Sequence, residues 1–137
     1  MIIKSVVIGL GKIGMEYNYN DSSKNFIATH VKSLIFHPNF ELVGAVDSDS
    51  DRRNRFNKKY NISAYERIED LPKKSKIDVV IIATNTKDHF DSFVKIIEHF
   101  NSNNPLFSCY DVVNFLKRNP ELILINESVI RTGDKEF

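Results

Sequence analysis

The sequence predicts an α/β protein built on a doubly wound parallel sheet with helices on both of its faces. Three observations carry this prediction. An apolar, β-branched segment runs into a glycine-rich turn over residues 2–14, a second apolar segment over 40–46 ends at an acidic residue, and a continuous apolar run lies at 77–83. Residues with helical periodicity follow each segment, and strands that alternate with helices form parallel sheets.

Size and composition indicate a single globular domain. The chain has 137 residues, of which 42% are hydrophobic and 27% charged, and its net charge is +1. This charge gives no broad electrostatic reason to bind nucleic acid or an anionic membrane. The single cysteine, Cys109, excludes an intramolecular disulfide, and no apolar run approaches the roughly 20 residues of a membrane helix. We therefore expect a cytoplasmic protein without nucleic-acid or membrane partners.

The first strand leads into a Gly-x-Gly-x-x-Gly motif at residues 9–14. The first glycine of such a motif permits a tight turn, the second lets the backbone approach a pyrophosphate, and the third lets helix and strand pack closely. The N–H groups and the positive dipole end of the following helix favour the anion. Glycines also mark ordinary turns, but the preceding β-branched strand favours a dinucleotide site. The predicted cofactor-binding residues of this loop are Gly9, Gly11, Lys12, Ile13 and Gly14.

A polar insertion interrupts the helix that should follow the motif. Residues 15–17 continue the helical pattern, but residues 18–25 are rich in Asn, Asp and Ser, which favour turns. We expect a surface loop there, close to the nucleotide site. Helical spacing resumes at Ala28, Val31, Leu34 and Ile35 and ends at His37-Pro38.

The second strand, over residues 40–46, ends at Asp47. In dinucleotide-binding folds an acidic residue about 20 residues after the glycines accepts hydrogen bonds from the adenosine ribose, and the insertion explains the longer spacing here. The alternative is a plain helix cap, since residues 47–51 are rich in N-cap residues. Both can hold, with Asp47 on the ribose and Asp49 or Ser50 as the cap. The Asp47 charge would repel a 2′-phosphate, which favours NAD over NADP.

The helix expected over residues 51–60 is basic, and we expect most of its charge on a solvated face. Arg52 or Arg53 could nevertheless stack on the adenine or meet a 2′-phosphate. We assign Arg52 to the predicted cofactor site, and NADP stays open as the less favoured cofactor.

Two further strands complete the predicted sheet. Residues 62–65 form a short strand, and a helical turn over 66–71 follows, which Pro72 ends. The run over 77–83 has the pattern of a strand covered on both faces. Its carboxyl end is where an open parallel sheet binds ligands.

A helix is expected directly after this end. Asn85 or Thr86 is its predicted cap. Its apolar positions recur at helical spacing and are Phe90, Phe93, Val94, Ile97 and Phe100.

Residues 9–14, 43–47 and 77–89 together resemble the N-terminal half of the glucose-fructose oxidoreductase/inositol dehydrogenase (Gfo/Idh/MocA) family. The resemblance covers about residues 1–100 and rests on the order and spacing of these motifs. It implies a Rossmann domain that binds NAD or NADP. In family members a larger C-terminal domain completes the substrate pocket and forms most of the oligomer interface. The resemblance also implies that the nicotinamide side of the cofactor is lined by Ala83, Thr84 and Asn85, with His89 facing the same cleft.

Beyond residue 100 the sequence departs from the family pattern. The family has a fifth strand that ends in Glu-Lys-Pro, whose lysine takes part in proton transfer. Here residues 121–128 resemble that strand without the lysine or the proline. We assign residues 1–126 to the dinucleotide-binding domain, with 101–119 as an atypical helical insertion, and 127–137 to a polar tail. The C-terminal domain is expected to be absent.

Two main functional hypotheses follow. In the first, the chain is a dinucleotide-binding module related to sugar or cyclitol oxidoreductases that binds cofactor without turnover. In the second, it is an active NAD-dependent oxidoreductase completed by a partner chain or an oligomer mate. A regulatory protein that has lost ligand binding is a third, weaker hypothesis. Hydride transfer at an alcohol needs a base, and the titratable candidates near the expected cleft, His89 and Glu127, have no evident partner. We therefore favour the first hypothesis and assign no catalytic residue.

Two further expectations concern metals and assembly. The four histidines and one cysteine show no zinc-type spacing, so we expect no metal site. The segment 101–118 carries more apolar groups than one surface helix needs, among them Phe107 and Tyr110. It could fold back as an internal cover or pair across a two-fold axis, and we expect a homodimer with this helix in the contact.

Overall fold

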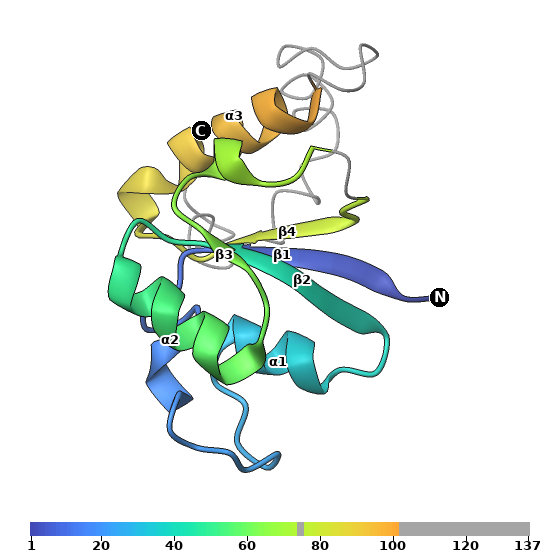
Figure 1. Ribbon diagram of the computed structural model, residues 1–137, viewed down its shortest axis with the longest axis vertical. Helices are drawn as coiled ribbons and strands as arrows, with labels where there is room; N and C mark the ends of the chain where they lie inside the picture. Colours follow the sequence, from blue (N-terminus) through green and yellow to red (C-terminus); the bar gives the residue numbers. More distant parts are fainter. Residues whose placement is uncertain (74–75, 102–137) are drawn as a thin grey trace, which may run out of the picture. The chain divides into compact units, whose positions relative to one another are not determined.

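A parallel four-stranded sheet forms the centre of the fold (Figure 1). The computed structural model describes residues 1–73 and 76–101. The strands are β1 (Ile3–Ile8), β2 (Phe40–Val46), β3 (Ala64–Tyr65) and β4 (Val79–Ile82), in the order β3-β2-β1-β4. All three neighbouring pairs are parallel. The chain divides into two compact units, Met1–Thr84 and a second that begins at Asn85, and the whole sheet belongs to the first.

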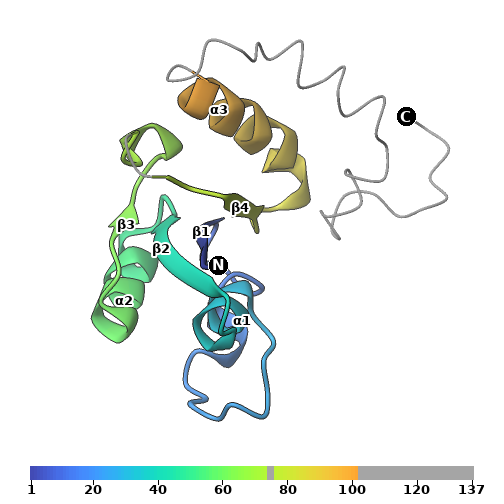
Figure 2. The same ribbon diagram turned by 90° about the vertical axis from the view of Figure 1, so that its right-hand side faces the viewer.

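Two helices cover one face of this sheet. Figure 2 shows α1 (His30–Phe36) and α2 (Ser50–Tyr60) side by side on it. The second unit contains α3 (His89–Asn101). Short 3₁₀ helices lie at Glu16–Asn18, Ile68–Asp70 and Thr86–Asp88. The parallel sheet with flanking helices confirms the predicted α/β class. Among the described helices, none combines the length and the apolar character needed to cross a membrane.

Local sequence explains where α1 and α2 begin and end. Thr29 precedes α1, and its hydroxyl accepts a hydrogen bond from the backbone N–H of Lys32. The Asp49 carboxylate accepts the N–H groups of Asp51 and Arg52 at the start of α2, so the prediction of Asp49 as a helix cap is confirmed. At the other end of α2, Asn61 has a left-handed backbone with φ of 54°. Asparagine tolerates this conformation better than most residues do.

The core lies between the sheet and these two helices. Phe56 is the one buried residue of α2, and the partly buried Tyr60 of the same basic helix also packs against the core. The core residues are Val7, Leu10, Met15, Val31, Leu34, Leu42, Ala45, Phe56 and Ala83.

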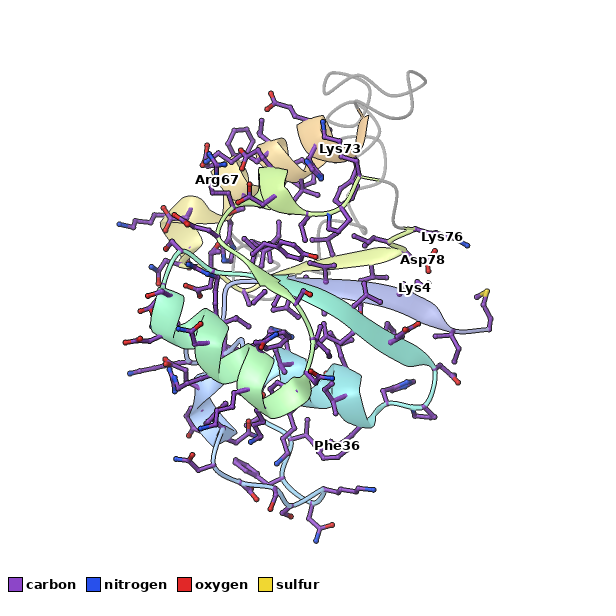
Figure 3. All side chains as sticks on the ribbon, in the orientation of Figure 1. Lys4, Phe36, Arg67, Lys73, Lys76 and Asp78 are labelled. Carbon is purple, nitrogen blue, oxygen red and sulfur yellow. The ribbon has the colours of Figure 1, made fainter. Side chains whose placement is uncertain are left out.

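Asp78 joins the amino ends of β1 and β4 (Figure 3). Its carboxylate accepts the backbone N–H of Lys4 at 3.0 Å, and its own N–H donates to the Lys4 carbonyl at 2.9 Å. The Lys76 ammonium lies 3.6 Å from the same carboxylate. The hydrogen bond from the Lys4 N–H lowers the pKa of Asp78. These contacts fix the alignment of β1 with β4 at the amino ends of the two strands.

Burial departs from the predicted pattern in α1. Lys32 is only 4% exposed, whereas the predicted apolar position Ile35 is exposed. The Lys32 ammonium donates to the carbonyl oxygens of Asp21 and Phe26 at 3.0 and 2.7 Å, and the Asp21 carboxylate lies 3.7 Å away. A lysine is buried here because the insertion supplies the carbonyl groups that its charge requires.

Two other burial predictions were wrong. The four residues of β4 are half-buried instead of covered on both faces, because β4 is an edge strand of the described sheet. In α3 the predicted apolar position Phe90 is exposed. The buried residues of α3 are instead His89, Ser92, Ile96 and His99, which share a helical face beside the predicted one.

Two glycines control the turn that leaves β1. Gly9 has φ of +99°, a conformation that residues with a β-carbon rarely adopt. Gly14 packs on the same turn, and a β-carbon at position 14 would lie 2.0 Å from the Gly9 carbonyl oxygen. That oxygen belongs to the backbone, so it cannot move aside without disrupting the turn.

Replacing Gly14 is therefore expected to destabilise the fold. We predict that Gly14→Ala lowers the free energy of unfolding by about 3 kcal/mol or more, because overpacking against backbone has no local remedy. Gly44→Ala is the matched control, since a β-carbon there would meet the Tyr65 ring at an ordinary 3.5 Å. It should change stability by less than about 1 kcal/mol. Urea unfolding of both variants tests this, and equal losses would contradict the assigned role of Gly14.

Candidate functional site

Three predicted site residues meet at the carboxyl edge of the sheet. Ile8 of β1 is paired with Val46 of β2 and with Ile82 of β4. The residues that follow these strands are Gly9, Asp47 and Ala83. Hydrogen bonds of 2.7 Å join the Gly9 N–H to the Val46 carbonyl and the Ala83 N–H to the Ile8 carbonyl. The register of the sheet thus brings three distant parts of the sequence to one place.

Gly11 lies at the open side of this loop. Among the described residues, a β-carbon at position 11 would have no heavy atom nearer than 3.9 Å, an ordinary contact distance, and that nearest atom belongs to the Arg52 guanidinium. Packing within this part of the chain therefore does not require a glycine here. A glycine without a packing role leaves room for a ligand to approach the backbone, which is the role of the second glycine in a pyrophosphate-binding loop. Lys12 and Ile13, next along the loop, are exposed.

The helical turn after Gly11 is continued by α1. The N–H of Met15 bonds to the Gly11 carbonyl at 2.9 Å, and that of Val31 bonds to the Gly14 carbonyl at 3.0 Å. The chain therefore leaves the helical path after the first turn, forms the insertion, and resumes the same path at α1. The first N–H groups of such a turn have no intrahelical acceptor and can bind an anion.

Asp47 joins this loop to the end of β2. Its Oδ2 accepts the Leu10 N–H at 2.7 Å, and its Oδ1 accepts the Asp49 N–H at 2.8 Å. The carboxylate is thus fixed in place by two backbone groups and is 9% exposed. A carboxylate offers about four acceptor positions, so two remain for a ligand hydroxyl. Sequence reasoning predicted the ribose contact and missed the bond to Leu10.

The two arginines that the sequence left as alternatives lie in different places. The Arg53 guanidinium donates at 2.8 Å to the carbonyl oxygens of Asp47 and Ser48, so Arg53 supports the loop after β2. Arg52 lies beside Gly11, with its Nη1 at 3.8 Å from Oδ2 of Asp47. Of the two, Arg52 is therefore the one available at the open side of the loop.

Glu16 is a charged residue of this edge that sequence reasoning missed. Its Oε2 lies 3.4 Å from Nη2 of Arg52, and its Oε1 accepts a hydrogen bond from Arg55. The hydrogen bond from Arg55 lowers the pKa of Glu16, the charge of Arg52 adds to the effect, and partial burial opposes it. Glu16 and Arg52 are 36 positions apart, so no local pattern connects them.

The insertion that follows Glu16 is tied to the domain by side chains. Asn18 is buried, donates to the Phe26 carbonyl at 3.0 Å and accepts from the Thr29 hydroxyl at 2.9 Å. The Tyr19 hydroxyl donates to the Arg55 carbonyl at 2.9 Å, and the Lys59 ammonium donates to the Tyr19 carbonyl and lies 4.4 Å above the Tyr19 ring. The predicted surface loop is thus anchored on both α1 and α2.

Most of the chain matches the model of a known family. The family model described as the Gfo/Idh/MocA oxidoreductase family, NAD-binding Rossmann fold, matches residues 3–103. The chain belongs to this family. The resemblance noted from the glycine loop, Asp47 and the segment at 77–89 is therefore confirmed. A comparison with curated protein sequences gave no match.

Solved structures from the family share the fold. A protein described as a dehydrogenase from Bordetella bronchiseptica is 26% identical, with a TM-score of 0.57, over 73% of this chain and 23% of its own. The WlbA dehydrogenase of Bordetella pertussis, in complex with NADH and UDP-GlcNAcA, is 16% identical with a TM-score of 0.56, over 72% and 27%. The scyllo-inositol dehydrogenase of Lactobacillus casei, with bound NAD(H) and scyllo-inositol, is 18% identical with a TM-score of 0.50, over 73% and 26%. The chain thus spans about a quarter of the length of these relatives.

The remaining predicted site residues stay predictions. Thr84 follows Ala83 at the end of β4 in the first unit. Asn85 and His89 belong to the second unit, in which His89 is buried at the start of α3 and Asn85 makes no side-chain cap. Glu127, the atypical insertion at 101–119 and the helix expected to form the homodimer lie outside the described residues.

The Glu16 contacts predict a pH dependence of stability. Because the folded state lowers the pKa of Glu16, its contribution is present above the ordinary glutamate pKa of about 4.5 and is lost as the pH falls through the lowered value. Wild type should exceed Glu16→Gln by about 0.5–1 kcal/mol in free energy of unfolding at pH 7, the size expected of partly exposed ion pairs. Urea unfolding from pH 7 to pH 3 should show this difference shrinking below about pH 4.5. A difference that stays constant across this range would contradict the ionic role of Glu16.

Proposed function

We propose that this chain is a cytoplasmic module that binds NAD(H) at the carboxyl edge of its sheet, in preference to NADP(H). The observation that carries the proposal is Gly11, where a β-carbon would make only an ordinary contact of 3.9 Å, with the Arg52 guanidinium, so that packing among the described residues does not require a glycine. The presence of NADH or NAD(H) in the Bordetella pertussis and Lactobacillus casei structures supports the same class of ligand.

Each part of the edge has a role in this proposal. The N–H groups of the turn at residues 11–14, together with Lys12 and Ile13, would surround the diphosphate. Asp47, already oriented by two backbone N–H groups, would accept the hydroxyl groups of the adenosine ribose. Ala83 and Thr84 would line the nicotinamide side. When bound, the nicotinamide supplies a hydride acceptor or donor.

We further propose that the chain does not complete hydride transfer at an alcohol on its own. That reaction needs a base within hydrogen-bond reach of the hydroxyl. The carboxylates beside the glycine loop are engaged elsewhere, since Asp47 accepts backbone N–H groups and Glu16 is paired with two arginines. The alternative, an active enzyme completed by a partner chain or an oligomer mate, needs a base from that source.

Binding can be tested on the full chain by calorimetry. We expect NADH to bind more tightly than NADPH, because the buried carboxylate of Asp47 repels a 2′-phosphate. Gly11→Ala should weaken NADH binding by about tenfold or more, because its methyl group occupies the space next to the backbone. Equal affinity for both dinucleotides, or none for either, would contradict the proposal.

The stability of the variant provides the control for this experiment. Gly11→Ala should unfold in urea like wild type, because a β-carbon there meets nothing closer than 3.9 Å. Asp47→Ala is a poorer probe, since it also releases the Leu10 N–H and loosens the loop itself. A loss of binding in Gly11→Ala together with a loss of stability would indicate a structural role instead.

Turnover provides a separate test. The purified chain should not reduce NAD with inositols or aldoses, because the two described carboxylates beside the glycine loop, Asp47 and Glu16, are held by backbone N–H groups and by arginines. The measurement is the absorbance of reduced cofactor over a panel of these substrates. Turnover on any of them by the purified chain would support the alternative of an active enzyme. The base would then come from an oligomer mate or from another residue of this chain.

A further inference from the structure

The guanidinium of Arg52 lies near two carboxylates. Its guanidinium lies next to the open side of Gly11, with Oε2 of Glu16 at 3.4 Å and Oδ2 of Asp47 at 3.8 Å. One cation is therefore shared between two carboxylates. The Arg52 side chain is about one-third exposed, so it can be reached from solvent.

Dinucleotide-binding folds distinguish their cofactors at this place. An acidic residue at the end of the second strand binds the ribose hydroxyls of NAD, whereas a nearby arginine accommodates the 2′-phosphate of NADP. Here both residue types are present, the acidic one as Asp47 and the arginine as Arg52. A 2′-phosphate would compete with two carboxylates for Arg52 and would be repelled by each of them. A 2′-hydroxyl carries no charge and meets neither penalty.

A second arginine of α2 holds Glu16 in position. Arg55 donates to its other carboxylate oxygen, and the Tyr19 hydroxyl binds the Arg55 carbonyl at 2.9 Å. Glu16 begins the 3₁₀ helix Glu16–Asn18, which leads into the insertion, and does not lie at the end of β2, where the acidic residue of dinucleotide-binding folds lies. This 3₁₀ helix thus brings a second carboxylate to the cofactor edge.

We propose that Glu16 is a second specificity-determining residue, which keeps Arg52 from a 2′-phosphate and so adds to the NAD preference set by Asp47. This inference rests on the proposed binding of a nicotinamide dinucleotide. Glu16 acts through Arg52, so it is a positioning residue that touches no reacting atom.

The test compares the affinities of NADH and NADPH in the full chain. The quantity measured is the ratio of their dissociation constants, by calorimetry or by the fluorescence of the reduced cofactors. Glu16→Gln keeps the size of the side chain and removes its charge, so it should improve NADPH binding relative to NADH by about five- to tenfold, as expected for a charged hydrogen bond at a partly exposed site. A change in stability alone would alter both affinities equally and leave the ratio unchanged.

Two further variants isolate the mechanism. Glu41→Gln removes the same charge from an exposed position at the opposite end of β2 and should leave the ratio within about twofold of wild type. Adding Arg52→Gln to Glu16→Gln should abolish the gain, because the phosphate then has no cation to bind.

The outcomes separate this inference from the proposed function. If wild type binds NADH and the ratio does not change in Glu16→Gln, the role of Glu16 is overturned and the proposed function stands. A shift of the same size in Glu41→Gln, or a gain that survives the removal of Arg52, also overturns it. If wild type binds neither dinucleotide, the proposed function fails and this inference fails with it.

Discussion

The backbone of Gly14 lies against the carbonyl of Gly9, at a separation that leaves no room for a β-carbon. This contact places the first helical turn directly on the end of β1, and the arrangement of the edge depends on it. The turn directs the Leu10 N–H toward Asp47 and leaves the Gly11 backbone open. A side chain at position 14 would separate helix from strand and move every donor of the loop. The third glycine of the motif thus serves the fold, whereas the proposed role of the second is to admit the ligand.

Charge at this edge is balanced along a chain of contacts that joins three elements. Asp47 comes from the end of β2, Arg52 and Arg55 come from α2, and Glu16 comes from the 3₁₀ helix before the insertion. Each carboxylate has a cationic or N–H partner, and each of the two arginines has a carboxylate partner. Such a network holds its members in fixed positions and makes the addition of another anion unfavourable. The proposed preference for an uncharged ribose would therefore have the same physical origin as the support of the glycine loop.

The insertion is accommodated because the helix that it interrupts still forms. The N–H groups of His30 and Val31 bond to the carbonyls of Ile13 and Gly14, as if α1 were the next turn of the same helix. The carbonyl of Phe26, just after the insertion, accepts hydrogen bonds from Lys32 and Asn18, both buried. The buried charge of Lys32 is satisfied in turn by this carbonyl and by that of Asp21. Within the described residues, the family fold is thus retained around an added segment.

The sequence by itself determined the parts of this protein that depend on local order. The glycine spacing at residues 9–14, the β-branched strands and the Asp49 cap are each set by neighbours a few residues away, and the structure has them where the patterns predicted. Tertiary structure alone decided which carboxylate holds the Leu10 N–H, which arginine faces Gly11, and that Glu16 lies beside it. These contacts join residues 36 to 41 positions apart. Periodicity reports which side of its own element a residue occupies, whereas the pairing of distant side chains depends on where the packed sheet and the inserted segment place the backbone.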